Sequence, residues 1–353
     1  MPTNELLQVF QNTTNSYKYY WWYSLLILLK KYPNHKIFSF EDVAIQMIVL
    51  VWYPIHYFKI SFGKQDQLDK LVKKIKLIYD FPEDISETEL KKELNEKRSE
   101  KEMSQILDAL TRYVPFRFLR PWYPELGGIP DGAVNKRILT FQNISTNQPP
   151  YQIKNREIYF NDNWWEWIKT NILLLEKFTL FELFRYVEKN NANTPNISFK
   201  LFKPEKRKLA GPTLIWKGFL KSQPGIKTIF EKKPANLLNS FSIDHYIPWS
   251  YLTHDQLWNL HPVEQTSNSS KGNKLPHPSY SMNFCSLQYD FVQYLIEKEN
   301  KKYLLDYNQF LLSSSRDFAN MPKVTFQQKL KEKMEIHIET AYSMGYKNNW
   351  ILE

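Results

Sequence analysis

The segment from Phe241 to Pro276 holds the side chains of this sequence that are best suited to chemistry. Asp244 is followed directly by His245, and Asn259, Asn268 and Lys271 come after them. A histidine with a pKa near neutrality can take a proton from water, and carboxylate and amide oxygens can hold a hard divalent cation. Hydrolysis of a phosphodiester needs these groups: an activated water, neutralised phosphorane oxygens and a stabilised leaving oxygen.

The order and spacing of these residues resemble those of the HNH (ββα-metal) endonucleases. The resemblance rests on three motifs in a row, DHYIPWS, WNL and NSSKGNKLP. Asn268 stands where a third histidine is common, so the sequence is similar to the HNN variety. The resemblance implies a first strand ending at Asp244 and His245, a second strand containing Asn259, and a helix that carries Asn268 and Lys271.

The resemblance also implies a role for each residue. His245 is the general base, and Asp244 and Asn268 hold the metal. Asn259 is expected to hold the loop and to orient His245 through a hydrogen bond, while Lys271 faces a phosphate. Because an amide oxygen is a harder ligand than imidazole, Mg²⁺ or Mn²⁺ is expected rather than zinc or nickel.

Other polar residues of this segment are interpreted as structural. His254, His261 and His277 have no cysteine near them, and their spacing matches no zinc-finger pattern. Asp255 is expected to cap the turn after Thr253. A histidine beside an aspartate would by itself also be interpreted as structural. Catalysis by His245 is favoured because Asn259, Asn268 and Lys271 follow it at the spacing of the motif.

Positive charge is concentrated just upstream of this segment. The 353 residues carry a formal charge of +10, with 47 Lys and Arg against 37 Asp and Glu. The basic stretch 200–233 has ten Lys and Arg against two Glu. We expect Lys206, Arg207 and Lys208 to bind DNA, because basic side chains near phosphates strengthen binding without reading sequence. The alternative is a solvated linker.

The sequence as a whole predicts an α+β protein, mostly helical, with an inserted ββα-metal (HNH) nuclease core. The expected regions are a helical N-terminal domain (1–130), a mixed α/β middle region (131–235), the nuclease core (236–290) and C-terminal helices (291–353). The apolar stretches Tyr19 to Leu29 and Val43 to Tyr57 are too short to cross a bilayer and predict buried helices.

Local patterns predict further elements outside the core. The run YQIKNREIYF (151–160) alternates like a hairpin with its turn at residues 154–156. Two separate helices are expected after it, one around residues 162–168 and one from about Thr179 to Glu188. A last amphipathic helix, from about Phe326 to Met344, is expected to brace the nuclease core.

Composition limits the compartment and the partners. A single cysteine, Cys285, excludes a disulfide or a Cys-based zinc site within one chain, and the polar first residues lack the pattern of a secretion signal. We therefore expect a cytoplasmic protein that does not enter a membrane. Its expected partner is nucleic acid, DNA rather than RNA, with a homodimer or a defence-system partner protein as further candidates.

The arrangement of a helical region before the nuclease core is similar to that of prokaryotic restriction and anti-phage defence HNH proteins. Two alternatives to an active DNA endonuclease stay open. One is a nuclease that acts on RNA or is activated by a partner, suggested by the large N-terminal region. The other is a nucleic-acid-binding module with a silent nuclease core. The intact set of Asp244, His245 and Asn268 argues against the silent core.

Overall fold

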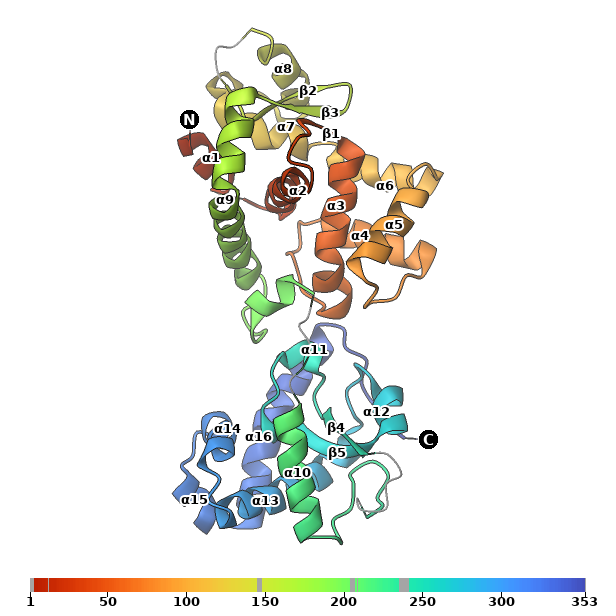
Figure 1. Cartoon of the computed structure of the whole chain (residues 1–353), viewed down its shortest axis with the longest axis vertical. Helices are drawn as coiled ribbons and strands as arrows, with labels where there is room; N and C mark the ends of the chain where they lie inside the picture. The colour runs from red at the N-terminus through yellow and green to blue at the C-terminus, as the bar shows by residue number, and fades with distance from the viewer. Residues whose placement is uncertain are drawn as a thin grey trace. The chain divides into compact units, whose positions relative to one another are not determined.

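The computed structural model describes residues 3–11, 13–144, 148–203, 207, 209–234 and 241–352. It is mostly helical with small sheets, in agreement with the expected α+β class (Figure 1). The chain forms two compact units, unit 1 with Met1–Ala192 and Ile197–Lys203, and unit 2 with Asn193–Asn196 and Pro204–Glu353. Region 1–130 lies in unit 1, region 131–235 is divided between the units, and 236–353 lies in unit 2.

Unit 1 consists of helices around one small sheet. Its helices are α1 (Thr3–Val9), α2 (Tyr17–Lys31), α3 (Phe40–Trp52), the π-helix η1 (Tyr53–Tyr57), α4 (Leu68–Tyr79), α5 (Glu87–Glu96), α6 (Lys101–Thr111), α7 (Val114–Leu119), α8 (Val134–Phe141) and α9 (Asp162–Lys189). Short 3₁₀ turns are η2 (Arg120–Trp122), η3 (Pro124–Leu126), η4 (Asp131–Ala133) and η5 (Ile197–Leu201). Among the helices in these described ranges, none is long and apolar enough to cross a membrane.

The core of unit 1 forms around α2, which packs against α3 and α9. Most aromatic residues of α2 are buried, as expected for a core helix: Trp21 and Trp22 are fully shielded from solvent. The ring of Trp22 stacks on Phe118 with 5.0 Å between centroids. The indole of Trp21 donates a hydrogen bond of 2.9 Å to the hydroxyl of Tyr151, so its polar atom is satisfied inside the core.

The sheet of unit 1 has the order β1-β3-β2, with all pairs antiparallel: β1 (Ile37–Ser39), β2 (Tyr151–Lys154) and β3 (Glu157–Phe160). The expected hairpin is confirmed. Asn155 and Arg156 have φ of 50° and 62°, the two left-handed residues of a type I′ turn.

The segment after the hairpin differs from the expectation of two helices. It is one continuous helix, α9, from Asp162 to Lys189. The residues between the two expected helices, 169–178, contain no proline or glycine. Leu175 and Thr179 are buried on the same face as Ile168 and Leu183, so one apolar stripe runs through the whole helix.

Unit 2 places a two-stranded antiparallel sheet among helices (Figure 1). Its elements are α10 (Ala210–Ser222), β4 (Phe241–His245), α11 (Trp249–Leu252), the 3₁₀ turn η7 (Leu257–Asn259), β5 (Leu260–Glu264), α12 (Gln265–Lys271), the 3₁₀ turn η8 (Pro278–Tyr280), α13 (Ser281–Glu297), α14 (Lys301–Leu311), α15 (Ser315–Asn320) and α16 (Lys323–Ser343).

Helices α13 and α14 hold the start of β5 by buried hydrogen bonds. The amide nitrogen of Gln288 in α13 donates a hydrogen bond of 2.7 Å to the carbonyl of Leu260. The hydroxyl of Tyr307 in α14 donates a hydrogen bond to the amide oxygen of Gln288. The carboxylate of Asp306 accepts 2.9 Å from the backbone N–H of Leu257. Helix α16 packs along α13 with Phe326, Leu330 and Met334 buried, as its sequence pattern predicts.

Candidate active site

The candidate residues gather around the β4–β5 hairpin and α12. The strands pair in a register that sets Asp244 opposite His261 and His245 opposite Leu260. Asp244 and His245 are the last two residues of β4, as expected, and their side chains leave the strand on opposite faces. Asn259 lies in the turn η7 directly before β5, rather than in the strand itself.

His245 is almost fully buried, at 1% exposed, and has one hydrogen-bonded ring nitrogen. Its Nε2 lies 2.9 Å from Oδ1 of Asp255. A carboxylate can only accept here, so Nε2 carries the proton. Nδ1 therefore keeps its lone pair, and it has no hydrogen-bond partner among the described residues. The arrangement gives His245 a basic nitrogen of defined position.

The environment of His245 keeps its ring neutral. Burial lowers its pKa, and this effect outweighs the hydrogen bond to Asp255 and the charges of Asp244 and Asp255, which raise it. The charge of Arg207 also lowers the pKa. A neutral imidazole with a free nitrogen is the form that a general base requires.

Asp244 forms a buried ion pair with Lys271. The ammonium of Lys271 lies 3.0 Å from Oδ2 of Asp244 and donates 2.7 Å to the backbone carbonyl of His245. Burial alone raises the pKa of the Asp244 carboxyl, but the charge of Lys271 reverses this, and the pKa lies below its ordinary value. The carboxyl is therefore ionised. Oδ2 is the oxygen of this carboxylate that the ammonium approaches.

This position of Lys271 differs from the expected phosphate contact. The side chain is 0% exposed and points back over the hairpin instead of outward. The physical reason is the ionised, buried carboxylate, which needs a compensating charge that Lys271 at the end of α12 can supply.

Asn259 fixes the loop that follows His245. Its amide oxygen accepts 2.8 Å from the backbone N–H of Ile247, and its amide nitrogen donates 2.8 Å to the carbonyl of the same residue. The backbone N–H of Tyr246 donates 2.8 Å to the carbonyl of Asn259. Asn259 thus holds the loop in the expected way, but the residue that bonds the His245 ring is Asp255.

Asn268 lies over the same face of β4 as Asp244. Its amide nitrogen is 3.3 Å from the hydroxyl of Ser242, two residues before Asp244 and therefore on the same face of the strand. Lys271, three residues after Asn268 in α12, contacts Asp244 itself. The amide oxygen of Asn268 and Oδ2 of Asp244 are hard oxygen donors, the type that Mg²⁺ and Mn²⁺ prefer.

The donor set fits a cation held by few protein ligands. Oδ2 of Asp244 is buried, and the ammonium of Lys271 lies 3.0 Å from it. Within the described part of the chain, no group of three or more His, Cys, Asp or Glu side chains could hold a metal ion.

Two residues at the site were interpreted as structural from the sequence. Asp255 was expected to cap a turn, but its carboxylate bonds His245 from a loop ten residues away. His261 faces the same side of the sheet as Asp244, is fully buried, and burial lowers its pKa to about 4. Only the hairpin register, which pairs residues seventeen positions apart, brings His261 to Asp244.

The basic stretch runs from unit 1 into unit 2, since η5 belongs to unit 1 and α10 to unit 2. Arg207 is exposed, with its guanidinium 5.5 Å from the ring centroid of Trp249. Lys206 and Lys208 lie outside the described residues. The remaining lysines of this stretch in unit 2 are exposed and have no ion pair with another described residue: Lys217, Lys221, Lys227, Lys232 and Lys233.

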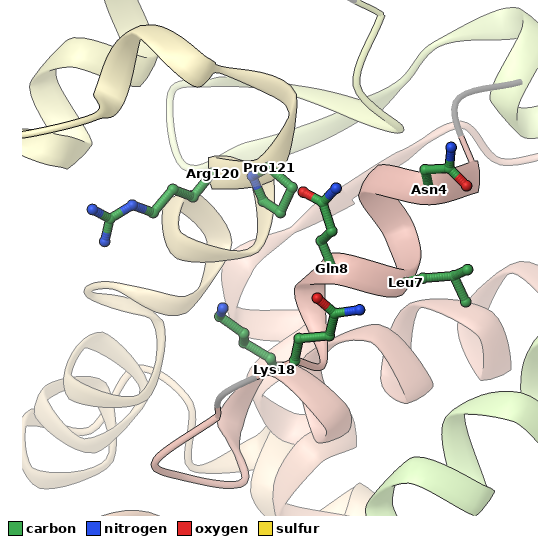
Figure 2. A pocket seen from close by; sticks show the side chains of 7 residues that line it. Asn4, Leu7, Gln8, Lys18, Arg120 and Pro121 are labelled. Atoms are coloured by element: carbon green, nitrogen blue, oxygen red, sulfur yellow. The ribbon is translucent and has the colours of Figure 1, made fainter.

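A separate pocket of about 500 Å³ lies in unit 1. Figure 2 shows its lining side chains, which include Gln8 from α1, Lys18 from α2 and Arg120 from η2. The pocket is polar and basic, and the described residues that line it include no histidine, cysteine or carboxylate. It lacks the acid–base and ligand groups found around His245.

Comparison with known proteins identifies the hairpin region. Residues 231–277 match the family described as HNH endonuclease, which confirms the resemblance seen in the sequence. The matched segment contains β4, β5 and α12 with the residues gathered around the hairpin, and the candidate DNA-binding residues 206–208 lie before it. No curated protein and no solved structure matches the chain.

Proposed function

Starting from an HNH endonuclease domain at residues 231–277, we propose that this protein is a metal-dependent endonuclease that hydrolyses the phosphodiester bonds of DNA. The observation that carries the proposal is the state of His245. Its Nε2 is bonded to Asp255, its Nδ1 is free of any described partner, and the ionised Asp244 precedes it in the strand. The hairpin and α12 act as a ββα-metal core.

In this reaction His245 is the general base. Its Nδ1 takes a proton from the water that attacks phosphorus, and the imidazolium that forms is stabilised by the carboxylate 2.9 Å from Nε2. Asp255 is thus the positioning residue for the base. Asn259 keeps the loop after His245 in place through its two bonds to Ile247.

Asp244 and Asn268 hold a divalent cation, Mg²⁺ or Mn²⁺. When bound, the cation supplies positive charge for the non-bridging and leaving oxygens of the phosphodiester. Asp244 contributes a carboxylate that is already ionised, so no proton has to leave it first. Asn268 contributes a neutral amide oxygen from α12, which lies on the same face of β4 as the side chain of Asp244.

Positive charge beside the hairpin supports a nucleic-acid substrate. Arg207 and the exposed lysines of residues 217–233 bind phosphates without reading base sequence. Lys206 and Lys208, the neighbours of Arg207 in the sequence, are proposed to do the same. A role in restriction or anti-phage defence, with a homodimer or partner protein, belongs to the same proposal and rests on the resemblance of the arrangement alone.

The test is nicking of supercoiled plasmid DNA by the purified full chain with Mg²⁺, with Mn²⁺ and with a chelator. We expect cation-dependent nicking that is lost in His245→Ala, while DNA affinity is retained, because the imidazole acts in the transition state. His35→Ala, an exposed histidine of unit 1, is the matched control and keeps full activity. Equal nicking by the wild type and His245→Ala would refute the assignment. Cleavage of RNA alone would change the substrate class.

A further inference from the structure

We propose that Lys271 is an internal competitor of the divalent cation: its ammonium neutralises Asp244 before the cation binds, and it is then released toward the substrate phosphates. This inference rests on the proposed function, because it concerns the same cation site. It assigns Lys271 two positions, a buried one seen in the structure and an outward one in the cation-bound protein.

The first argument is that the ion pair is specific and enclosed. Lys271 is 0% exposed, and its ammonium has two partners, Oδ2 of Asp244 at 3.0 Å and the carbonyl of His245 at 2.7 Å. Lysine is very rarely buried without a partner, so these contacts decide where the side chain lies. The lysine supplies the positive charge that an ionised, buried Asp244 requires.

The second argument is that lysine and cation need the same oxygen. Oδ2 is the Asp244 atom nearest the ammonium, and Asp244 is also the carboxylate that we propose holds the cation. A divalent cation binds a carboxylate oxygen at a shorter distance than the ammonium does here. Two positive groups at one oxygen repel each other strongly in a buried site. Binding of the one therefore weakens binding of the other by the same factor.

The third argument is that Lys271 lies at the end of its helix. It is the last residue of α12, and Gly272 follows with φ of +50°, so no helix continues beyond it. Rotation of its four-carbon stem carries the ammonium from Asp244 toward the outer end of α12. A positive charge is useful there, because phosphate charge develops beside the cation during the reaction. The buried position and the expected phosphate contact are then two states of one residue.

The first experiment measures binding of MnCl₂ by isothermal titration calorimetry to the full chain, without nucleic acid. Lys271→Met removes the competing charge and keeps an unbranched side chain, so we expect Mn²⁺ to bind at least about tenfold tighter than in the wild type. Lys274→Met is the matched control. Lys274 is in the same segment and donates to the carbonyl of Ser270 at 2.8 Å, and its loss leaves the affinity unchanged. Unchanged or weaker binding in Lys271→Met overturns the proposal.

The second experiment needs no variant that could fail to fold. The wild type is acetylated with an N-hydroxysuccinimide ester with and without saturating Mn²⁺, and modification of each lysine is measured by mass spectrometry. We expect the cation to raise labelling of Lys271 severalfold and to leave Lys274 unchanged. Constant labelling of Lys271 in protein that demonstrably binds Mn²⁺ overturns the displacement.

The outcomes separate this inference from the proposed function. If the wild type binds Mn²⁺ and nicks DNA but neither experiment detects competition, the inference alone fails. If neither the wild type nor Lys271→Met binds Mn²⁺, both fail. Tight binding by Lys271→Met with weak binding by the wild type supports both.

Discussion

The contact between Asp255 and His245 makes the sharpest prediction, for the variant Asp255→Asn. The substitution keeps the shape of the side chain 2.9 Å from Nε2 but removes its charge and adds an N–H donor. The wild-type carboxylate accepts only from Nε2–H, which leaves Nδ1 as the base. The amide can instead donate to Nε2, which favours the other tautomer and places the proton on the catalytic nitrogen.

The expected loss follows from the charge that His245 acquires in the reaction. A hydrogen bond to a charged group contributes about 1.5–3 kcal/mol. With about 1.4 kcal/mol for each tenfold in rate, losing this bond to the forming imidazolium slows nicking about 10- to 140-fold. The unfavourable tautomer adds to this, so a loss of about 100-fold or more is expected, within the range of general acid–base catalysis. DNA affinity stays unchanged, since Asp255 is not expected to touch the substrate.

The assay is the single-turnover nicking rate with Mg²⁺ as a function of pH, together with DNA binding by fluorescence anisotropy. Asp255 raises the pKa of His245, so its neutralisation lowers that pKa. The rate rises with pH as the base loses its proton, and the rising limb of Asp255→Asn therefore moves to lower pH. In a His245→Ala background, Asp255→Asn has no further effect on the rate. A rate within about threefold of the wild type, with an unshifted profile, would refute the reasoning.

Two further predictions concern acid stability and DNA binding. Burial lowers the pKa of His56 in unit 1 to about 3, so the unfolded chain binds a proton below about pH 6.5 that the folded chain does not. The free energy of unfolding therefore falls by about 2 kcal/mol between pH 7 and pH 5. His56→Phe is expected to reduce this fall, measured by urea unfolding at the two pH values. An equal fall in both proteins would contradict the lowered pKa of His56. Replacing Lys206, Arg207 and Lys208 by alanine is expected to weaken DNA binding for all sequences and to reduce the slope of log K against log salt by up to about 3. The control is a second triple variant in α4, with Lys70, Lys73 and Lys74 replaced by alanine, which removes the same charge. Equal slopes in the two triple variants would show that the basic stretch is a linker that does not bind DNA.

The sequence predicted those parts of the fold that depend on neighbouring residues. The apolar helices α2 and α3, the turn at Asn155 and Arg156, and the amphipathic α16 all follow from local periodicity or turn chemistry. The strand–strand–helix order around Asp244 and Asn268 followed from motif spacing, and the family match at residues 231–277 agrees with it.

The remaining features depend on contacts between separate elements. The carboxylate of Asp255 reaches His245 across a loop, and Lys271 reaches Asp244 from another helix, so no local pattern distinguishes these residues from a turn cap or a surface lysine. His261 was set aside because it lacked a metal-ligand spacing, yet the strand register places it opposite Asp244. The expectation of two helices was wrong for α9, since residues 169–178 contain no proline or glycine that would end a helix.

The chain passes more than once between the two units, and this limits where the protein can be cut into fragments. Residues 193–196 belong to unit 2, and residues 197–203 belong again to unit 1, so the backbone passes from one unit to the other three times. A fragment that starts at residue 204 loses the bond of 2.9 Å from Asn196 to the carbonyl of Leu252. A fragment that starts at residue 193 carries Ile197 and Leu201 away from the helix α9 against which their turn packs. A single breakpoint in residues 193–204 therefore removes contacts from one unit or the other.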